Sequence, residues 1–411
     1  MLPTKDAWKT ERYFYIRTGW RDTTAFWETD ERFVFIMTPR ERFIAALTFG
    51  NPDKIPLQSG GPRESTLREW HKQGLPEGKN HTEALLEELG LPPAPKYTET
   101  NIGVSFRMIP EFEEIVLSHE NGHKIVQDWM GAITEISEEF DATYIRNARD
   151  FVTRKWHKFP VENHDDWQEM KKRFCLDTGG RFPNDFEERA LLLKNRDYVS
   201  GINFNGPFWQ MREWLGMENL CVLFLDDPDF IREMVEFWTD FIEQILVKTT
   251  KIYVPDYVHI SEDMAYKAHP MISPALTREF LLPSYNRWIK IIKTAGVPII
   301  DMDSDGYVDD LIPIWIEAGF NVCDPVEVAA GNDIVKFREK YGKKMAYRGG
   351  IDKRAIAAGG RIMEEEVMRV VPPLLKDGGF IPSCDHGVPP DISWQNYIEY
   401  SRLLAKLCGW L

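Results

Sequence analysis

The chain has 411 residues, of which 43% are hydrophobic and 28% charged, and its net charge is -15 at pH 7. These proportions are ordinary for a globular protein, and the acidic balance argues against general affinity for nucleic acid or for an anionic membrane surface. No apolar run approaches the roughly 18 residues of a membrane span, so we expect no membrane association. Residues 1–6 lack an apolar signal core, so we expect a cytoplasmic protein.

The five cysteines are scattered and form no Cys-x-x-Cys pair. This spacing argues against a disulfide framework and against a structural zinc finger. Residues 1–37 are rich in aromatic residues and arginine, which is too apolar for a disordered tail. We expect this N-terminal extension to pack on the body of the protein or on a sister subunit, which would make a homodimer. Residues 38–411 are predicted to form one domain.

Thr38 and Pro39 are predicted to begin a helix, because Thr caps helices well and Pro suits the first turn. Periodicity and turn signals then predict further elements along the chain. Short strands are expected at 55–58, 104–108, 124–127, 143–146 and 198–205, and helices at 228–250, 274–295, 332–341, 364–375 and 394–407.

In the C-terminal half, short apolar runs repeatedly stop on charged or catalytic-type side chains. The five runs are 257–263, 297–306, 320–325, 345–352 and 380–387, and helical periodicity separates them. Strands buried on both faces that alternate with helices indicate a parallel sheet. The pattern predicts an α/β protein with a (β/α)8 TIM barrel, whose strand C-termini open onto one active-site face. Convergence of polar side chains at that face predicts an enzyme.

Asp303 and Asp305 are two residues apart at a strand end, so their side chains would share one face. With His386 at the end of the last strand, and Glu262 as a fourth ligand, they would form a metal site. Two carboxylates, an imidazole and an open position suit catalytic zinc. The alternative is that Asp305 and Gly306 form a turn and Asp303 caps a helix.

His386 could instead be a proton donor that Asp385 orients. Glu262 could act as an acid, a metal ligand or an ion-pair partner of Arg348. Arg348 would then either hold carboxylates in place or contact substrate.

Four further residues are predicted around the substrate. Asn203 and Asn205 end a strand and would bind substrate oxygens or satisfy loop backbone groups. Tyr266 would line the entrance, and Cys384 would form a small wall of the pocket.

Several ordered motifs between residues 38 and 411 resemble those of the uroporphyrinogen decarboxylase superfamily. They are Pro39-Arg40-Glu41-Arg42-Phe43, Gly206-Pro207-Phe208, Asp303-Ser304-Asp305-Gly306, Gly349-Gly350-Ile351-Asp352 and Asp385-His386-Gly387. The resemblance implies a TIM barrel. The arginine-rich segment that decarboxylases carry after the first strand is replaced here by Gly60-Gly61-Pro62-Arg63-Glu64-Ser65.

The other branch of this superfamily contains corrinoid-dependent methyltransferases, whose zinc sites follow a His-x-Cys-Gly pattern with a later Cys. Here Asp303-Ser304-Asp305-Gly306 and His386-Gly387 occupy those places. Oxygen-rich ligands match an oxygen-bearing substrate better than a thiol. The chain therefore resembles the methyltransferase component of aryl methyl ether O-demethylases. That resemblance implies zinc, a methoxylated aromatic substrate and a separate partner protein that carries a Co(I) corrinoid.

Other interpretations compete with this one. A related decarboxylase would act on a smaller carboxylated substrate without a corrinoid. Methylamines or betaines could be the methyl donors. A barrel that only binds a corrinoid protein or a ligand is the non-enzymatic alternative, but a scaffold has no need to keep polar strand ends together.

Overall fold

The computed structural model describes residues 36–97, 100–140, 150 and 153–411. The chain divides into two compact units, Met1–Ile36 and Met37–Leu411. The predicted N-terminal extension, with its role in a homodimer, lies outside the described residues apart from its last two positions. The strand predicted at 143–146 also lies outside them. None of the helices in the described part of the chain has the length and apolar character needed to span a bilayer.

Six parallel strands form the central sheet, in the order β10-β9-β8-β7-β6-β5. They are β5 (Gly201–Asn205), β6 (Tyr257–Ser261), β7 (Ile299–Asp303), β8 (Val322–Asp324), β9 (Ala346–Ile351) and β10 (Phe380–Cys384). β6 to β10 match the five predicted apolar runs, β5 lies within the strand predicted at 198–205, and neighbours in the sheet are neighbours in sequence. The predicted parallel sheet is confirmed.

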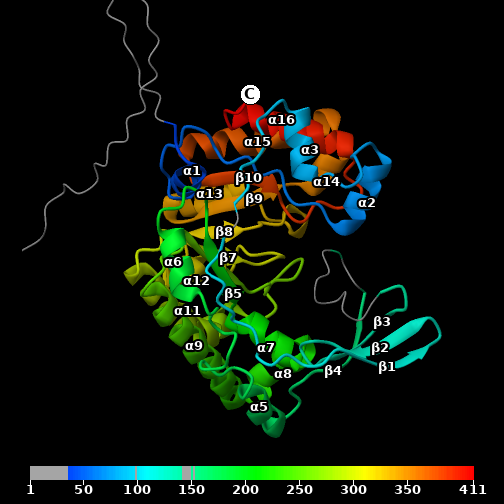
Figure 1. Ribbon diagram of the computed structural model, residues 1–411, viewed down its shortest axis with the longest axis vertical. Helices are drawn as coiled ribbons and strands as arrows, with labels where there is room; N and C mark the ends of the chain where they lie inside the picture. The colour runs from blue at the N-terminus through cyan, green and yellow to red at the C-terminus, as the bar shows by residue number, and fades with distance from the viewer. Residues whose placement is uncertain (1–35, 98–99, 141–149, 151–152) are drawn as a thin grey trace, which may run out of the picture. The chain divides into compact units, whose positions relative to one another are not determined.

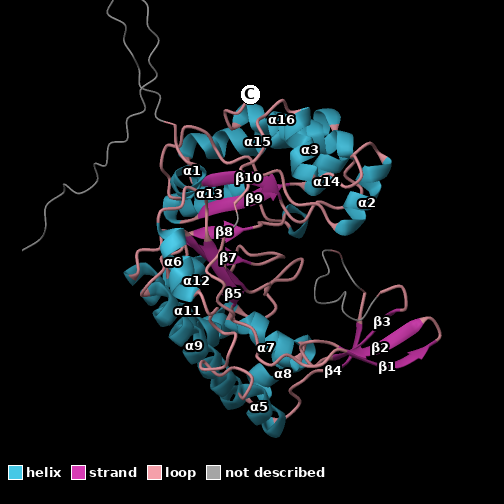
Figure 2. Cartoon of the chain, in the orientation of Figure 1, coloured by secondary structure: helices cyan, strands magenta, loops and turns pink. Residues whose placement is uncertain are grey.

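Helices connect these strands and cover the outer side of the sheet (Figure 1 and Figure 2). They are α7 (Pro207–Leu215), α8 (Met217–Asp226), α9 (Pro228–Thr250), α10 (Pro274–Leu276), α11 (Leu282–Thr294), α12 (Ile312–Ala318), α13 (Ile334–Tyr341), α14 (Lys353–Ala358), α15 (Gly360–Asp377) and α16 (Trp394–Leu407). A π-helical turn, Thr277–Leu281, joins α10 to α11.

Local sequence explains where the predicted helices begin. The Asp227 side chain accepts a hydrogen bond from Phe230 N at the start of α9, and Ser393 caps α16 in the same way. These side chains satisfy backbone donors that a helix leaves free at its first turn.

Irregular extended segments continue the sheet beyond both edges. Pro62 forms a parallel bridge with Val388 beyond β10. Beyond β5, Ser200 Oγ donates to Thr100 O at 2.6 Å, and the Phe106 ring lies 5.0 Å from that of Phe204. The regular strands predicted at 55–58 and 104–108 are wrong, since both segments lack ladder pairing. With these segments the chain has the predicted TIM-barrel fold.

Helix α1 (Pro39–Leu47) closes one end of the barrel. Its Phe43, Ala46 and Leu47 form a buried cluster with residues at the start of four strands: Ile299, Val322, Ala346 and Ile381. Thr38 and Glu41 form a capping box at its N-terminus, which confirms the helix start predicted at Thr38 and Pro39. An apolar plug at the strand N-termini leaves the opposite end of the barrel for polar side chains.

A second sheet precedes β5. It is antiparallel, in the order β1-β2-β3-β4: β1 (Ile115–Glu120), β2 (His123–Gln127), β3 (Ile133–Ser137) and β4 (Lys155–Lys158). The other described helices that precede β5 in sequence are α2 (Glu64–Lys72), α3 (His81–Glu88), α5 (His164–Lys171) and α6 (Phe186–Lys194). The strand predicted at 124–127 is confirmed as β2.

Candidate active site at the strand C-termini

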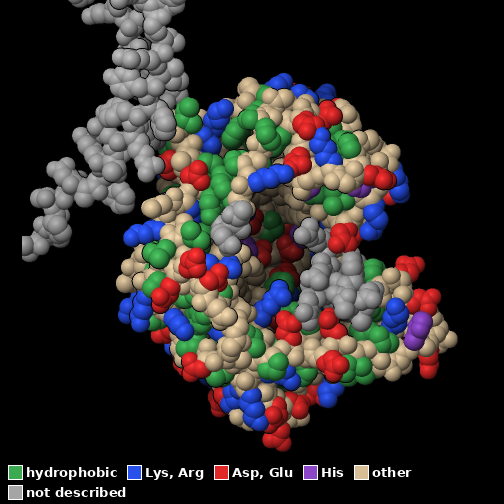
Figure 3. All heavy atoms as spheres, in the orientation of Figure 1, with side chains coloured by type: hydrophobic (Ala, Val, Ile, Leu, Met, Phe, Trp, Pro, Cys, Tyr) green, Lys and Arg blue, Asp and Glu red, His purple; other side chains and the backbone are tan. Residues whose placement is uncertain are grey.

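A pocket of about 380 Å³ lies at the C-terminal ends of the barrel strands. We call it the mouth pocket. Its walls are acidic and small: Gly60, Gly61, Trp209, Asp263, Asp303, Asp305, Asp324, Pro325, Ser383, Cys384, His386 and Gly387. In space-filling view, acidic side chains gather within a hollow of the face shown (Figure 3). Asp303, Asp305 and His386, predicted from separate parts of the sequence, therefore line one cavity.

Asp305 and His386 form the closest pair in this group. His386 Nε2 lies 3.0 Å from Asp305 Oδ2, and His386 Nδ1 lies 3.3 Å from Arg63 Nη2. Because a guanidinium only donates, Nδ1 accepts from Arg63 only in the neutral ring, in which Nε2–H donates to Asp305; protonation would replace the Arg63 contact with an Nδ1–H donor. The hydrogen bond with Asp305 raises the pKa of His386, while burial partly offsets it. The ring is therefore placed both to hold a proton and to release one.

The turn after β7 aims Asp305 into the pocket. Gly306 has a φ of 81°, and a Cβ there would collide with the backbone of Ala265. Tyr307 N donates to Tyr266 O at 2.9 Å, which fixes the chain just beyond the glycine. The sequence Asp305-Gly306 thus forms a tight turn, as the alternative reading allowed, and Asp305 still faces His386.

A charged layer lies beneath the pocket, inside the barrel. His259 Nδ1 is 3.0 Å from Asp301 Oδ2, and His259 Nε2 is 3.4 Å from Asp303 Oδ2. Arg348 Nη1 lies 2.9 Å from Asp301 Oδ2 and 3.4 Å from Asp324 Oδ2. Arg348 therefore pairs with Asp301 and Asp324, whereas the sequence suggested Glu262 as its partner.

These contacts shift the ionisation of the layer. Burial lowers the pKa of His259, but its hydrogen bonds with Asp301 and Asp303 outweigh burial and raise it to about 10. Burial raises the pKa of Asp324 to about 6, although Arg348 opposes the shift. Arg348 itself stays fully charged, because the two carboxylates outweigh its burial. The layer holds two cations, His259 and Arg348, directly below the mouth pocket.

The compact group of potential metal ligands among the described residues is His259, Asp301 and Asp324, whose ligand atoms lie within 4.8 Å of one another. This is not the predicted set. Arg348 already pairs with both carboxylates of this group, so their negative charge is balanced without a metal ion. Of the predicted ligands, Asp305 and His386 are in contact, and Asp303 lines the same pocket.

Glu262 lies apart from the mouth pocket. It is fully buried, where it accepts a hydrogen bond from Trp209 N at 2.9 Å and another from the Tyr285 hydroxyl. Gly206 leaves the space that the carboxylate fills. Burial raises the pKa of Glu262 to about 7. In this position Glu262 connects the end of β6 to the N-terminus of α7. The N-terminus of a helix favours a negative charge nearby.

Asp385 also faces away from the His386 ring. Its carboxylate accepts from Val328 N at 2.8 Å and from Lys353 N at 3.1 Å, so it holds the loops after β8 and β9 together. The residue that orients His386 is Asp305. The sequence suggested Asp385 for this role because it is the neighbour along the chain.

The predicted substrate-binding residues are spread out. Asn203 is exposed and opposite His259 in the sheet register, and Asn205 Nδ2 lies 3.2 Å from both Gln210 Oε1 and Glu213 Oε2. Cys384 is a buried wall of the mouth pocket, and burial raises its pKa to about 12. Tyr266 is 73% exposed and does not line the mouth pocket.

Sequence reasoning missed three members of the charged layer, His259, Asp301 and Asp324, and it missed Arg63. The signal for Asp301 was present, since it is two residues before Asp303 and shares its face of the strand. The pairing with His259 needs the register of β6 against β7, which places His259 opposite Asp301.

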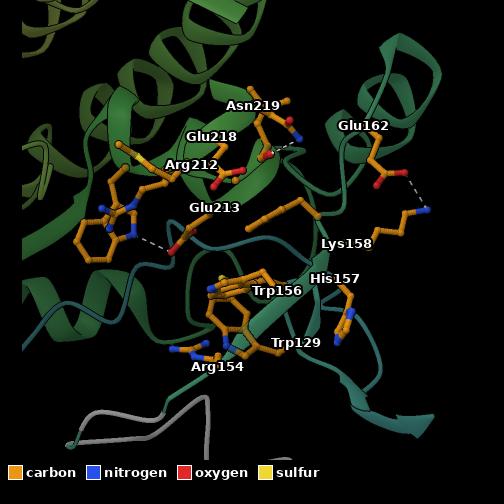
Figure 4. Close-up of a pocket in the computed structure, with 16 residues that line it drawn as sticks. Trp129, Arg154, Trp156, His157, Lys158, Glu162, Arg212, Glu213, Glu218 and Asn219 are labelled. Atoms are coloured by element: carbon orange, nitrogen blue, oxygen red, sulfur yellow. Dashed lines mark hydrogen bonds and ion pairs between the residues drawn. The ribbon is translucent and has the colours of Figure 1, made fainter. Parts of the chain in front are cut away.

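A second cavity, of about 810 Å³, lies where the antiparallel sheet meets α7 and α8. We call it the tryptophan pocket. Aromatic and charged side chains line it, among them Trp129, Arg154, Trp156, Lys158, Phe159, Trp209 and Arg212 (Figure 4). Trp209 also lines the mouth pocket. The two cavities therefore share one wall.

A barrel with charged side chains gathered at its strand C-termini has the site architecture of TIM-barrel enzymes. Residues 200–402, which contain the whole parallel sheet, match the family uroporphyrinogen decarboxylase (URO-D). This part of the chain belongs to the uroporphyrinogen decarboxylase superfamily, as the motifs predicted.

Individual relatives are distant. A uroporphyrinogen decarboxylase from Vesicomyosocius okutanii is 28% identical over 89 residues, which is 21% of this chain and 26% of that protein. The chain thus matches about a quarter of that relative's length. A methyltransferase from Methanosarcina mazei is 15% identical and superposes with a TM-score of 0.50 over 91% of this chain and 98% of that one, which supports the fold. A B12-independent methionine synthase from Shewanella sp. W3-18-1 gives a TM-score of 0.35 at 12% identity, over 56% of this chain and 67% of that one.

Proposed function

We propose that the protein transfers a methyl group from a methoxylated aromatic compound to the Co(I) corrinoid of a partner protein. The reaction would take place in the mouth pocket. The observation that carries the proposal is the 3.0 Å contact between His386 and Asp305, within a cavity that Asp303 also lines. In this reaction the bond between the ether oxygen and the methyl carbon breaks, and its electron pair stays on the oxygen. The product is a phenol.

The acidity of the mouth pocket makes assistance at the oxygen necessary. Asp263, Asp303, Asp305 and Asp324 line it, and negative charge on these groups would oppose growing charge on a phenolate. A proton from His386 relieves this by converting the leaving oxygen to a hydroxyl. The hydrogen bond that His386 donates to Asp305 raises the pKa of His386, which favours the protonated ring that this step uses.

A divalent cation is the second means of assistance, and the donors present fit one. Asp305 and His386 offer adjacent oxygen and nitrogen atoms, and Asp303 offers another carboxylate on the same wall. These are donor types that zinc accepts. A bound zinc ion would act as a Lewis acid at the ether oxygen. His386 serves as ligand in that case and as proton donor without metal.

The charge of the mouth pocket disfavours the competing function, a decarboxylase that holds the carboxylate of a smaller carboxylated substrate in this pocket. Four aspartates line the cavity. Carboxylates of a substrate would meet like charge there and would need cationic partners. Arg348 and His259, the cations of the layer below the pocket, are already paired with Asp301, Asp303 and Asp324. A methoxyl group carries no charge and meets no such penalty.

The proposal is tested by mixing the full-length protein with 4-methoxybenzoate and free Co(I) cobalamin, which stands in for the unidentified corrinoid protein. Loss of Co(I) absorbance together with formation of 4-hydroxybenzoate supports methyl transfer. His386→Ala should slow the reaction about 100-fold or more, the usual scale of a lost proton donor. His269→Ala is the matched control, because His269 is exposed and lies outside the mouth pocket. Carbon dioxide release without any cobalamin requirement would identify a decarboxylase instead.

A further inference from the structure

We propose that the tryptophan pocket binds the ring and carboxylate of an aromatic carboxylic acid, with Arg154 as the partner of the carboxylate. This inference rests on the proposed methyl transfer and adds the chemical class of its substrate. The cavity of about 810 Å³ is within the size range of small-molecule sites. Its walls combine aromatic rings with basic and acidic side chains, and Arg154 is the basic one that forms no ion pair within the described part of the chain.

The walls present aromatic faces to the cavity. Trp156 and Phe159 stack with ring centroids 5.0 Å apart and an interplanar angle of 18°. Phe159 is seated against Gly216, where a Cβ would overlap its ring. Trp156 nevertheless remains 41% exposed. Large aromatic surface left open in a cavity is typical of a site for a planar apolar group.

Arg154 differs from the other cations of the pocket. Its guanidinium carbon lies 5.0 Å from the Trp156 ring centroid, and no carboxylate lies within ion-pair distance of it among residues 36–97, 100–140, 150 and 153–411. Each of the other three basic side chains that line the pocket has a partner: Arg212 with Asp263 at 2.9 Å, Lys158 with Glu162 at 3.4 Å and His157 with Glu135 at 3.0 Å.

Burial also makes Arg154 a good partner for an anion. Burial lowers its pKa, and the field of Asp128 only partly compensates. A benzoate carboxylate would supply the missing negative charge and accept two parallel hydrogen bonds from the guanidinium. The substrate ring would then lie beside the exposed part of Trp156, since Phe159 and Arg154 already contact the faces of that ring.

The mouth pocket fixes which end of the substrate enters it. Trp209 is the wall that both cavities share, so a ring in the tryptophan pocket lies beside the mouth pocket. The aspartates of the mouth pocket repel a carboxylate, and Arg154 attracts one. Both effects direct the carboxylate away from His386 and leave the uncharged methoxyl end to approach it.

Calorimetric titration of the full-length protein provides the test, with 4-methoxybenzoate and its neutral methyl ester as probes. Arg154→Met should weaken binding of the acid about 10- to 100-fold, the scale of a lost hydrogen bond to a charged group, and leave the ester unchanged. Trp156→Ala should weaken both probes alike. Lys172→Met is the control, because its exposed ion pair with Glu169 lies outside the tryptophan pocket, and it should change neither affinity by more than about twofold.

Equal affinity of the Arg154→Met variant and the wild type for the acid would overturn the inference. The inference would also fail if Arg154→Met weakened the binding of acid and ester equally and Trp156→Ala changed the affinity for neither. These titrations contain no corrinoid, so their outcome is separate from that of the methyl-transfer assay. If the acid binds through Arg154 but no methyl group is transferred, the pocket assignment stands and the proposed function fails. If transfer occurs and Arg154→Met leaves the KM for 4-methoxybenzoate unchanged, the pocket assignment fails alone.

Discussion

His386 and Asp305 meet across the barrel mouth, with Nε2 and Oδ2 3.0 Å apart, although 81 residues separate them in sequence. The contact joins the loop after β10 to the loop after β7. It is also the largest influence on the ionisation of His386, whose pKa it raises. The behaviour of this one pair therefore reports on the proton that the proposed reaction needs.

Asp305→Asn should lower the pKa of His386, because the amide keeps a hydrogen bond but removes the negative charge. A His that acts as an acid is active when protonated, so activity should be lost on raising pH, and in the variant this loss should begin at lower pH. Rates should fall between those of the wild type and His386→Ala. Titration of the His386 ring by NMR measures the shift without any assay. An unchanged midpoint would show that Asp305 does not control the ring.

Arg348→Met should destabilise the protein strongly. The guanidinium lies 2.9 Å from the buried Asp301 and 3.4 Å from Asp324, and its loss leaves Asp324 without its main cation and Asp301 with His259 alone. Breaking a buried pair in this way costs about 3–5 kcal/mol. Denaturant unfolding followed by circular dichroism measures the change in the free energy of unfolding.

The control for this prediction is Arg361→Met, which removes an ion pair with Glu365 on the surface of α15. Arg361 is 87% exposed, so the change should stay below about 1 kcal/mol. If the two variants lose similar stability, the charged layer inside the barrel does not depend on Arg348.

The sequence predicts the fold well because its signals are local. Buried strands read as apolar runs and the helices carry their own caps, so α9 and α16 begin at the predicted residues. The segments at 55–58 and 104–108 also read as apolar runs, but they do not form regular strands. Whether a segment forms ladder hydrogen bonds depends on the strands beside it in space, which its own composition does not reveal.

The site was only partly predictable, for a related reason. Strand ends converge, so Asp303, Asp305 and His386 could be expected in one cavity. Which side chain contacts which depends on register and rotamer across the barrel. Glu262 illustrates this, since it ends its strand like the others but turns into the core toward Tyr285. Asp385 likewise turns to backbone amides instead of toward His386.

Glu262 should make the stability of the protein depend on pH between about 4.5 and 7. Burial raises its pKa from 4.5 to about 7 in the folded protein. Its contribution to stability is fully present below the unfolded pKa, near 4.5, and is lost as pH rises through about 7, because the folded protein must then hold a buried charge. A shift of this size corresponds to about 3 kcal/mol.

Glu262→Gln should remove that part of the pH dependence, since the amide stays neutral while it can still accept from Trp209 N. The measurement is the free energy of unfolding of both proteins at several values between pH 4 and pH 8. Relative to wild type, the variant should gain stability as pH rises, because only the wild type loses its contribution. Parallel curves across this range would mean that Glu262 is ionised throughout, held charged by Trp209 N–H and the Tyr285 hydroxyl at the start of α7. In that case the carboxylate would be a permanent anion of the core and not a titrating group.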